Sequence, residues 1–122
     1  MENKYSFKTQ SDINQILNHL ENWKNQFSFE TSYYYEGWAI NLKEKSIYPR
    51  LIVIFGPYDE NYYSLKSFEI QYDENNKESY KELYLNSKID NIMNLKKEIN
   101  EIIYGKDLIN SISKEYNNMK NK

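Results

Sequence analysis

The stretch PRLIVIFGP, residues 49–57, contains five consecutive apolar side chains between a proline on one side and a Gly-Pro pair on the other. Three of the five, residues 52–54, are β-branched, a composition that favours strands. A short apolar run without polar alternation, bounded in this way, is typical of a strand that is covered on both faces. We therefore expect a central, fully covered strand over residues 51–55.

Segments with a period of two residues lie on both sides of this central strand. Apolar residues alternate over residues 27–36, and after Gly37 the alternation continues over residues 38–42 in the opposite phase. A glycine at such a change of phase indicates either a bend in one long strand or a tight hairpin, and we favour the bend. Further strands are predicted over residues 64–72 and 80–85, although the last segment is also compatible with a helix.

Helical spacing of apolar residues marks both ends of the chain. It predicts an amphipathic helix over residues 12–25, with Ser11 as the N-cap. A second helix is predicted to begin at Ser87 with a capping box and to end at Gly105. The same spacing continues over residues 108–119 and predicts a short final helix.

This order of elements predicts a single two-layer α+β domain over residues 1–122. We expect an antiparallel sheet of three to four strands, with an N-terminal helix and one or two C-terminal helices packed on one face. The other face should be more polar and display the surplus tyrosines. The ends, about residues 1–8 and 118–122, are expected to be frayed.

The inventory of side chains argues against catalysis. The chain has 13 Tyr and 2 Trp but one His and no Cys, which leaves no disulfide, no thiolate and no cysteine-based zinc site. The single imidazole, His19, is interpreted as a solvent-facing boundary residue of the first helix, and three isolated glycines form no phosphate-binding loop. We therefore predict no catalytic residues, no metal and no cofactor, and we expect a protein that is not an enzyme.

Hydropathy bears on the cellular location. The longest apolar run, residues 51–55, is far too short to cross a bilayer, and the N-terminus has no basic-then-apolar signal. The absence of Cys fits a reducing compartment. A cytoplasmic protein without a membrane partner is expected.

Aromatic residues gather in two places where alternation turns some of them outward. Tyr and Trp provide large contact areas with few rotatable bonds and are enriched at the hot spots of protein interfaces. The only arginine is a further candidate anchor, although it also suits a charge that closes the sheet edge. Core packing, and the A/T-rich codons that also encode Asn, Lys and Ile, are alternative explanations for the tyrosines. The candidate partner-binding residues are Tyr33, Tyr34, Tyr35, Glu36, Trp38, Arg50, Tyr58, Asp59, Glu60, Tyr62 and Tyr63.

The distribution of charge indicates what kind of partner these residues would bind. Residues 58–82 carry seven acidic and three basic side chains, whereas residues 83–122 carry five acidic and seven basic ones. Exposed aromatics beside carboxylates suit a basic protein surface. We expect a small inhibitor that occludes a partner protein, either an immunity protein that neutralises a cognate toxin such as a nuclease, or a phage anti-defence inhibitor.

Three alternatives remain open. The chain could be a homo-oligomeric interaction domain, for example a homodimer, that associates through its isoleucine-rich C-terminal helices. It could be an enzyme that uses carboxylates or tyrosine in a cleft near Arg50. It could bind nucleic acid through lysines of the C-terminal helices, but a net charge of −2 and a single arginine argue against that partner.

Overall fold

The computed structural model describes residues 7–57, 62–109, 112 and 119. Two helices stand at the ends of the described chain and five strands lie between them. The elements are α1 (Phe7–Leu20), a short 3-10 helix (Glu21–Trp23), β1 (Phe27–Tyr33), β2 (Gly37–Glu44), β3 (Arg50–Pro57), β4 (Tyr63–Tyr72), β5 (Glu78–Ile89) and α2 (Ile92–Ile103). Among the described residues, no helix combines the length and the apolar character that crossing a membrane requires.

The five strands form one antiparallel sheet in the order β1-β2-β3-β4-β5. The predicted α+β class and antiparallel sheet are confirmed, but the expected number of three to four strands is wrong. The extra strand arises at Gly37, where the chain makes a hairpin and not the favoured bend. Tyr33 pairs with Trp38, and the Tyr34 backbone N–H donates to the Gly37 carbonyl at 2.7 Å.

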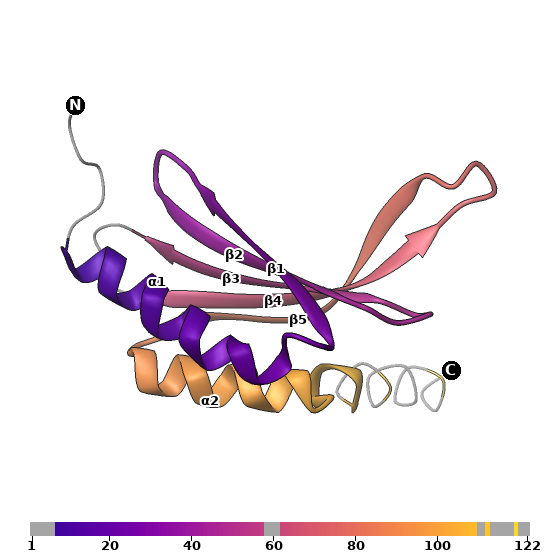
Figure 1. Ribbon diagram of the computed structural model, residues 1–122. Coiled ribbons are helices and arrows are strands. Elements are labelled where there is room, and N and C mark those ends of the chain that lie inside the picture. Colours follow the sequence, from indigo (N-terminus) through magenta and orange to yellow (C-terminus); the bar gives the residue numbers. More distant parts are fainter. Residues whose placement is uncertain (1–6, 58–61, 110–111, 113–118, 120–122) are drawn as a thin grey trace.

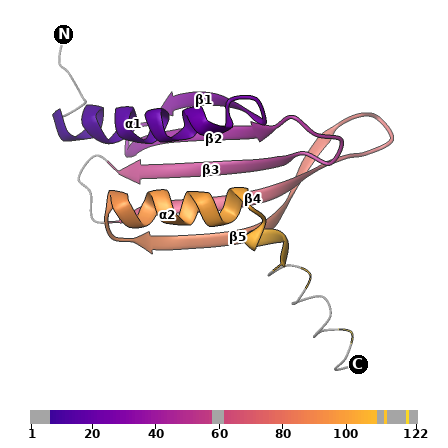
Figure 2. The same ribbon diagram turned by 60° about the horizontal axis from the view of Figure 1, so that its bottom comes forward.

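Both helices lie side by side along one face of the sheet (Figures 1 and 2). Their apolar stripes, including Ile16 of α1 and Ile99 of α2, are fully buried against Ile52 and Ile54 of β3 and their neighbours. The alternate β3 residues, at positions 51, 53 and 55, are only half-buried on the opposite face. The prediction that both faces of β3 are covered is therefore wrong, and we call the side without helices the open face.

The first helix begins earlier than the sequence predicts. It starts at Phe7 and not near residue 12, so Ser11 lies inside the helix and is not its N-cap. Thr9, which precedes the predicted start of the helix, is buried. Packing of this first turn, which the polar sequence does not reveal, extends the helix toward the N-terminus.

The junction between β5 and α2 also differs from the prediction. Residues 80–85 form a strand, as predicted, but β5 continues to Ile89 because that residue pairs with Tyr63 of β4. Ser87 therefore lies in the strand. The N-cap of α2 is Asn91, whose side chain accepts a hydrogen bond from the Asn94 N–H at 2.8 Å.

The predicted end of α2 near Gly105 is confirmed. The helix ends at Ile103, and Gly105 has a φ of 105°, which an L side chain would rarely adopt. The chain is helical again over residues 106–109, and at Ile112 and Met119. The other residues of the predicted final helix lie outside the described part of the chain.

The β4–β5 hairpin leans toward the open face. A shift of register places Ser67 opposite Tyr84 but Phe68 opposite Glu82, so one residue of β5 bulges out of the ladder. Beyond this bulge the hairpin rises away from the helices (Figure 1). Its far end approaches β2, where Lys43 and Glu78 form an ion pair at 3.5 Å although their strands are not neighbours.

Candidate functional site

The β1–β2 loop and the end of β3 lie at the same end of the sheet (Figure 1). The β1–β2 loop spans residues 34–36, and the β3–β4 loop connects Pro57 to Tyr63. The pairing of Gly37 with Pro57 places the β1–β2 loop beside the end of β3, and Tyr62 directly precedes β4 at the same end. We refer to Tyr33, Tyr34, Tyr35, Glu36 and Tyr62, which lie in or beside these loops, as the tyrosine end.

All members of the tyrosine end are exposed. The exposed fraction is 46% for Tyr33, 50% for Tyr34, 90% for Tyr35 and 48% for Tyr62, and Glu36 is exposed beside them. Exposure of several large aromatic rings at one place is unusual for a surface that contacts only water. The structure thus brings together members of both predicted aromatic clusters on an accessible surface.

Other predicted binding residues lie in the core. Trp38 is 1% exposed, and its ring lies 6.3 Å from that of Tyr63, which is also buried. The Tyr63 hydroxyl donates a hydrogen bond to Asp12 Oδ2 of α1 at 2.6 Å. These two aromatics hold the sheet to α1. Tyr58, Asp59 and Glu60 lie outside the described residues.

Arg50 is the centre of a buried ion cluster with Glu44 and Asp107, and it is only 5% exposed. Its Nε and Nη2 donate to the two carboxylate oxygens of Glu44 at 3.0 and 3.1 Å, and its Nη1 donates to Asp107 Oδ1 at 2.9 Å. Nη1 and Nη2 also donate to the carbonyls of Ile102 and Ile103 at 2.8 and 3.2 Å. A guanidinium has five N–H donors, so no donor is left for a partner or a substrate.

The electrostatics of this cluster favour the charged arginine. Burial alone would lower the pKa of Arg50, but the carboxylates of Glu44 and Asp107 more than offset that effect and raise it. The two accepting carbonyls belong to the last turn of α2, where helical carbonyls lack partners within the helix. Arg50 therefore anchors the end of α2 to β3.

His19 also has a structural contact. It is half-buried, and its Nε2 lies 2.8 Å from Asn100 Oδ1 of α2, while its ring stacks edge-on against Trp23. The interpretation of this residue as solvent-facing is wrong, because the neighbouring helix covers it. Within the described residues, no group of three His, Cys, Asp or Glu side chains is placed to hold a metal ion.

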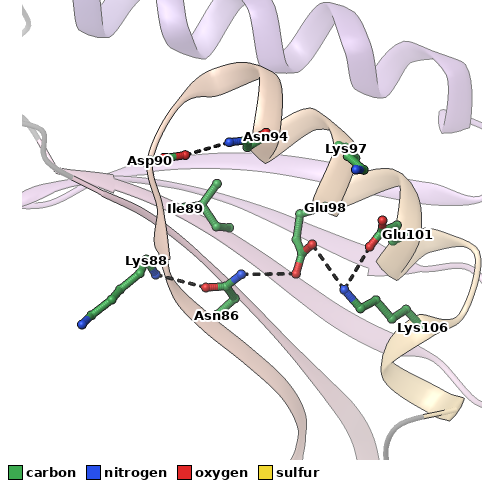
Figure 3. Close-up of a pocket in the computed structure, with 9 residues that line it drawn as sticks. All are labelled: Asn86, Lys88, Ile89, Asp90, Asn94, Lys97, Glu98, Glu101 and Lys106. Atoms are coloured by element: carbon green, nitrogen blue, oxygen red, sulfur yellow. Dashed lines mark hydrogen bonds and ion pairs between the residues drawn. The ribbon is translucent and has the colours of Figure 1, made fainter.

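A polar pocket between β5 and α2 is a feature that the sequence did not reveal (Figure 3). It has a volume of about 360 Å³. The Glu98 carboxylate accepts hydrogen bonds from the Tyr84 hydroxyl and from Asn86 Nδ2, and forms an ion pair with Lys106 at 3.5 Å. Lys106 Nζ also donates to Glu101 Oε2 at 2.9 Å. No local motif marks these residues, because β5 and α2 bring them together only in the fold.

Charges in this pocket neutralise one another. Burial, and then the hydrogen bond to Glu98, raises the pKa of Tyr84. The hydrogen bond to Glu101 raises the pKa of Lys106, and the same contact lowers the pKa of Glu101. The arrangement therefore joins β5, α2 and the following turn.

Alkaline pH should weaken this connection. Because the folded-state pKa of Tyr84 lies above its ordinary value of 10.0, the protonated form contributes stability that is complete below pH 10 and is lost as the pH rises further. Tyr84→Phe should reduce the alkaline loss of stability, as measured by urea unfolding at neutral pH and above pH 10. Tyr35→Phe controls for the removal of one hydroxyl. An unchanged alkaline slope in Tyr84→Phe would contradict this assignment.

Comparisons with protein-family models, with curated proteins and with solved structures find no match for this chain.

Proposed function

We propose that the protein is a small cytoplasmic inhibitor that binds another protein through the tyrosine end and occludes part of its surface. An immunity protein that neutralises a cognate toxin, such as a nuclease, is the form of this function that we favour, and a phage anti-defence inhibitor is the other. The observation that carries the proposal is the convergence of exposed rings from two separate loops at one end of the sheet.

Geometry supports the use of these rings as anchors. The β1–β2 turn is closed by the hydrogen bond between Tyr34 N–H and the Gly37 carbonyl, and Trp38 is buried directly behind it. The tyrosines of the turn therefore start from a fixed base and lose little backbone freedom on binding. A tyrosine side chain fixed in this way is a typical hot spot, worth about 2 kcal/mol or more when truncated.

Charge supports a basic partner. Glu36 lies within the tyrosine end. Residues 58–82 carry seven acidic and three basic side chains, and residues 73–77 form the β4–β5 turn at the opposite end of the sheet. This excess of carboxylates would attract a basic protein during encounter through its long-range field and would repel nucleic acid phosphates. A toxin or defence effector that itself acts on nucleic acid offers a basic surface of this kind.

Substitution of the tyrosine end tests the proposal. The partner to use is the product of the neighbouring reading frame, with binding measured by calorimetry and neutralisation by coexpression. Changing residues 33–35 from Tyr to Ser should weaken binding by at least about 2 kcal/mol, or about thirtyfold, and abolish protection. The matched control, Tyr48→Ser with Tyr72→Ser, removes exposed rings elsewhere on the surface and should keep binding and protection. Equal losses in both variants would refute the assignment of the surface.

Salt dependence tests the charge argument separately. Association with the same partner should slow as the salt concentration rises, because screening removes the long-range attraction between the acidic segment and a basic surface. The dissociation rate should change less, since the buried rings govern it. Salt-insensitive association would remove the basic partner from the proposal while leaving the role of the tyrosines intact.

A further inference from the structure

The open face carries an apolar strip that no element of the described chain covers. Leu51, Val53 and Phe55 of β3 lie at its centre, half-buried, and Phe68 of β4 pairs with Leu51 beside them. The strip continues to Leu85 at the β5 edge, which is exposed. A two-layer domain normally leaves a polar sheet face to solvent, so this face resembles one that packs against a further layer.

Two hollows lie side by side on this face. One, of about 330 Å³, is lined by Val53, Phe55 and Tyr34 among others. The second, of about 400 Å³, is lined by Leu51 together with Asn41 and polar residues of β1. Since Leu51 and Phe55 are four residues apart on a strand, the two hollows follow the direction of β3, about 13 Å along it. An elongated apolar element that lies along the strands would fill both.

Exposed apolar residues at helical spacing follow α2 in the described part of the chain. Leu108, Ile109, Ile112 and Met119 recur at helical spacing and are exposed, Ile112 by 66%, and Tyr104 at the end of α2 is exposed beside them. We call these five residues the C-terminal stripe. Tyr104 and Ile109 also line an apolar hollow of about 410 Å³. A stripe of this kind normally packs against another apolar surface.

The C-terminal stripe begins on the wrong side of the sheet to cover its own open face. Tyr104 lies against Trp23, with ring centroids 6.3 Å apart, at the end of the helical layer. Figures 1 and 2 show α2 running along the helical side of the sheet, so that the whole sheet lies between α2 and the open face. The open face and the stripe are therefore available to different molecules.

Charges around the two surfaces have opposite sign. On the open face, Lys43 is already paired with Glu78, and the remaining charges include the carboxylates of Glu30 and Glu82 and the amine of Lys66. Residues 106–122 carry four lysines and two acids. A segment with this excess of lysine, laid on a face with an excess of carboxylates, gains favourable electrostatics at the rim of the contact.

We infer that a second copy of the chain docks its C-terminal stripe on the open face. The contact joins two different patches of the chain. A twofold arrangement in which each copy covers the other gives a closed, isologous dimer, whereas a head-to-tail arrangement is heterologous and gives rings or longer assemblies. This association shares Tyr34 with the tyrosine end, because Tyr34 lines one of the two hollows, but it does not rest on the function proposed above.

Sedimentation of the full chain tests the inference, together with one substitution on each surface. The wild type should associate as its concentration rises. Val53→Lys on the open face and Ile112→Lys on the stripe should each raise the dissociation constant at least about tenfold. Leu85→Lys replaces Val53→Lys if that variant does not fold, since Leu85 is exposed at the edge of the same face. Asn18→Lys, on the exposed surface of α1, adds the same charge and should leave association unchanged.

Mixing the two variants gives the decisive result. Val53→Lys retains a normal stripe and Ile112→Lys retains a normal open face, so a mixture should form a one-to-one heterodimer at concentrations where neither variant associates alone. Pairing of stripe with stripe would let Val53→Lys associate by itself, and that result would overturn the inference. A wild type that stays monomeric at all concentrations would overturn it as well.

Discussion

Replacing Arg50 by alanine is expected to lower the free energy of unfolding by about 3–5 kcal/mol. The guanidinium is only 5% exposed and satisfies Glu44, Asp107 and two helical carbonyls at once. Its removal would leave Asp107 buried as an uncompensated carboxylate and would free the end of α2 from β3. We expect this to be the most damaging single substitution outside the apolar core.

Circular dichroism during urea unfolding measures the effect. Arg50→Lys should recover only part of the stability, because an ammonium cannot span the acceptors that the planar guanidinium reaches. The matched control is Lys24→Ala, which breaks the exposed contact with Glu21 at 4.0 Å and should cost less than about 1 kcal/mol. A loss for Arg50→Ala as small as that of the control would show that the buried cluster adds little to stability.

The second large effect is expected at Gly56, which faces the Trp38 ring across paired strands. A Cβ at this position would overlap Cζ2 and Cε2 of the indole. Because Trp38 is 1% exposed and enclosed by the core, its ring cannot move aside without disturbing β2 or α1. We expect Gly56→Ala to cost at least about 1–3 kcal/mol, the usual cost of overpacking.

A double-mutant cycle identifies the cause of that cost. Trp38→Phe vacates part of the space that the new methyl group would occupy, so Gly56→Ala should cost less in the Trp38→Phe background than in the wild type. Urea unfolding of the four proteins gives the coupling energy. Additive losses would mean that Gly56 is required for a reason other than the indole. Trp38 pairs with Tyr33 at the base of the β1–β2 hairpin. The coupling energy therefore also reports on the packing that supports the tyrosine end.

Local patterns predicted the class of fold and most strands, since periodicity reports which face of each element is buried. They could not separate the bend from the hairpin at Gly37, because both reverse the phase of alternation. The pairing of β1 with β2, which begins at Tyr33 and Trp38, is what distinguishes them. The end of β5 was misplaced for a similar reason, since the pairing of Ile89 with Tyr63 extends the strand past Ser87.

Among the candidate binding residues, the sequence could predict exposure only for those that lie in a turn. The turn residues Tyr34 and Tyr35 are exposed, as their place beside a glycine suggests. Trp38 and Arg50 are also candidate surface anchors by residue type, although Arg50 equally suits a charge that closes the sheet edge. Their burial depends on a small residue across the sheet and on Asp107, which is 57 positions further along the chain. The pattern of apolar residues around Trp38 and Arg50 in the sequence therefore does not predict that these two side chains are buried.

The Arg50 cluster has a consequence for the order of folding during synthesis. Its acceptors come from β2, from the end of α2 and from Asp107, so the last of them leaves the ribosome long after the sheet has been translated. A nascent chain that has emerged only as far as β5 holds a cation whose remaining acceptors have not yet been made. Closure of the sheet around that cation should await the final helix, and the native state should form only once nearly the whole chain is free.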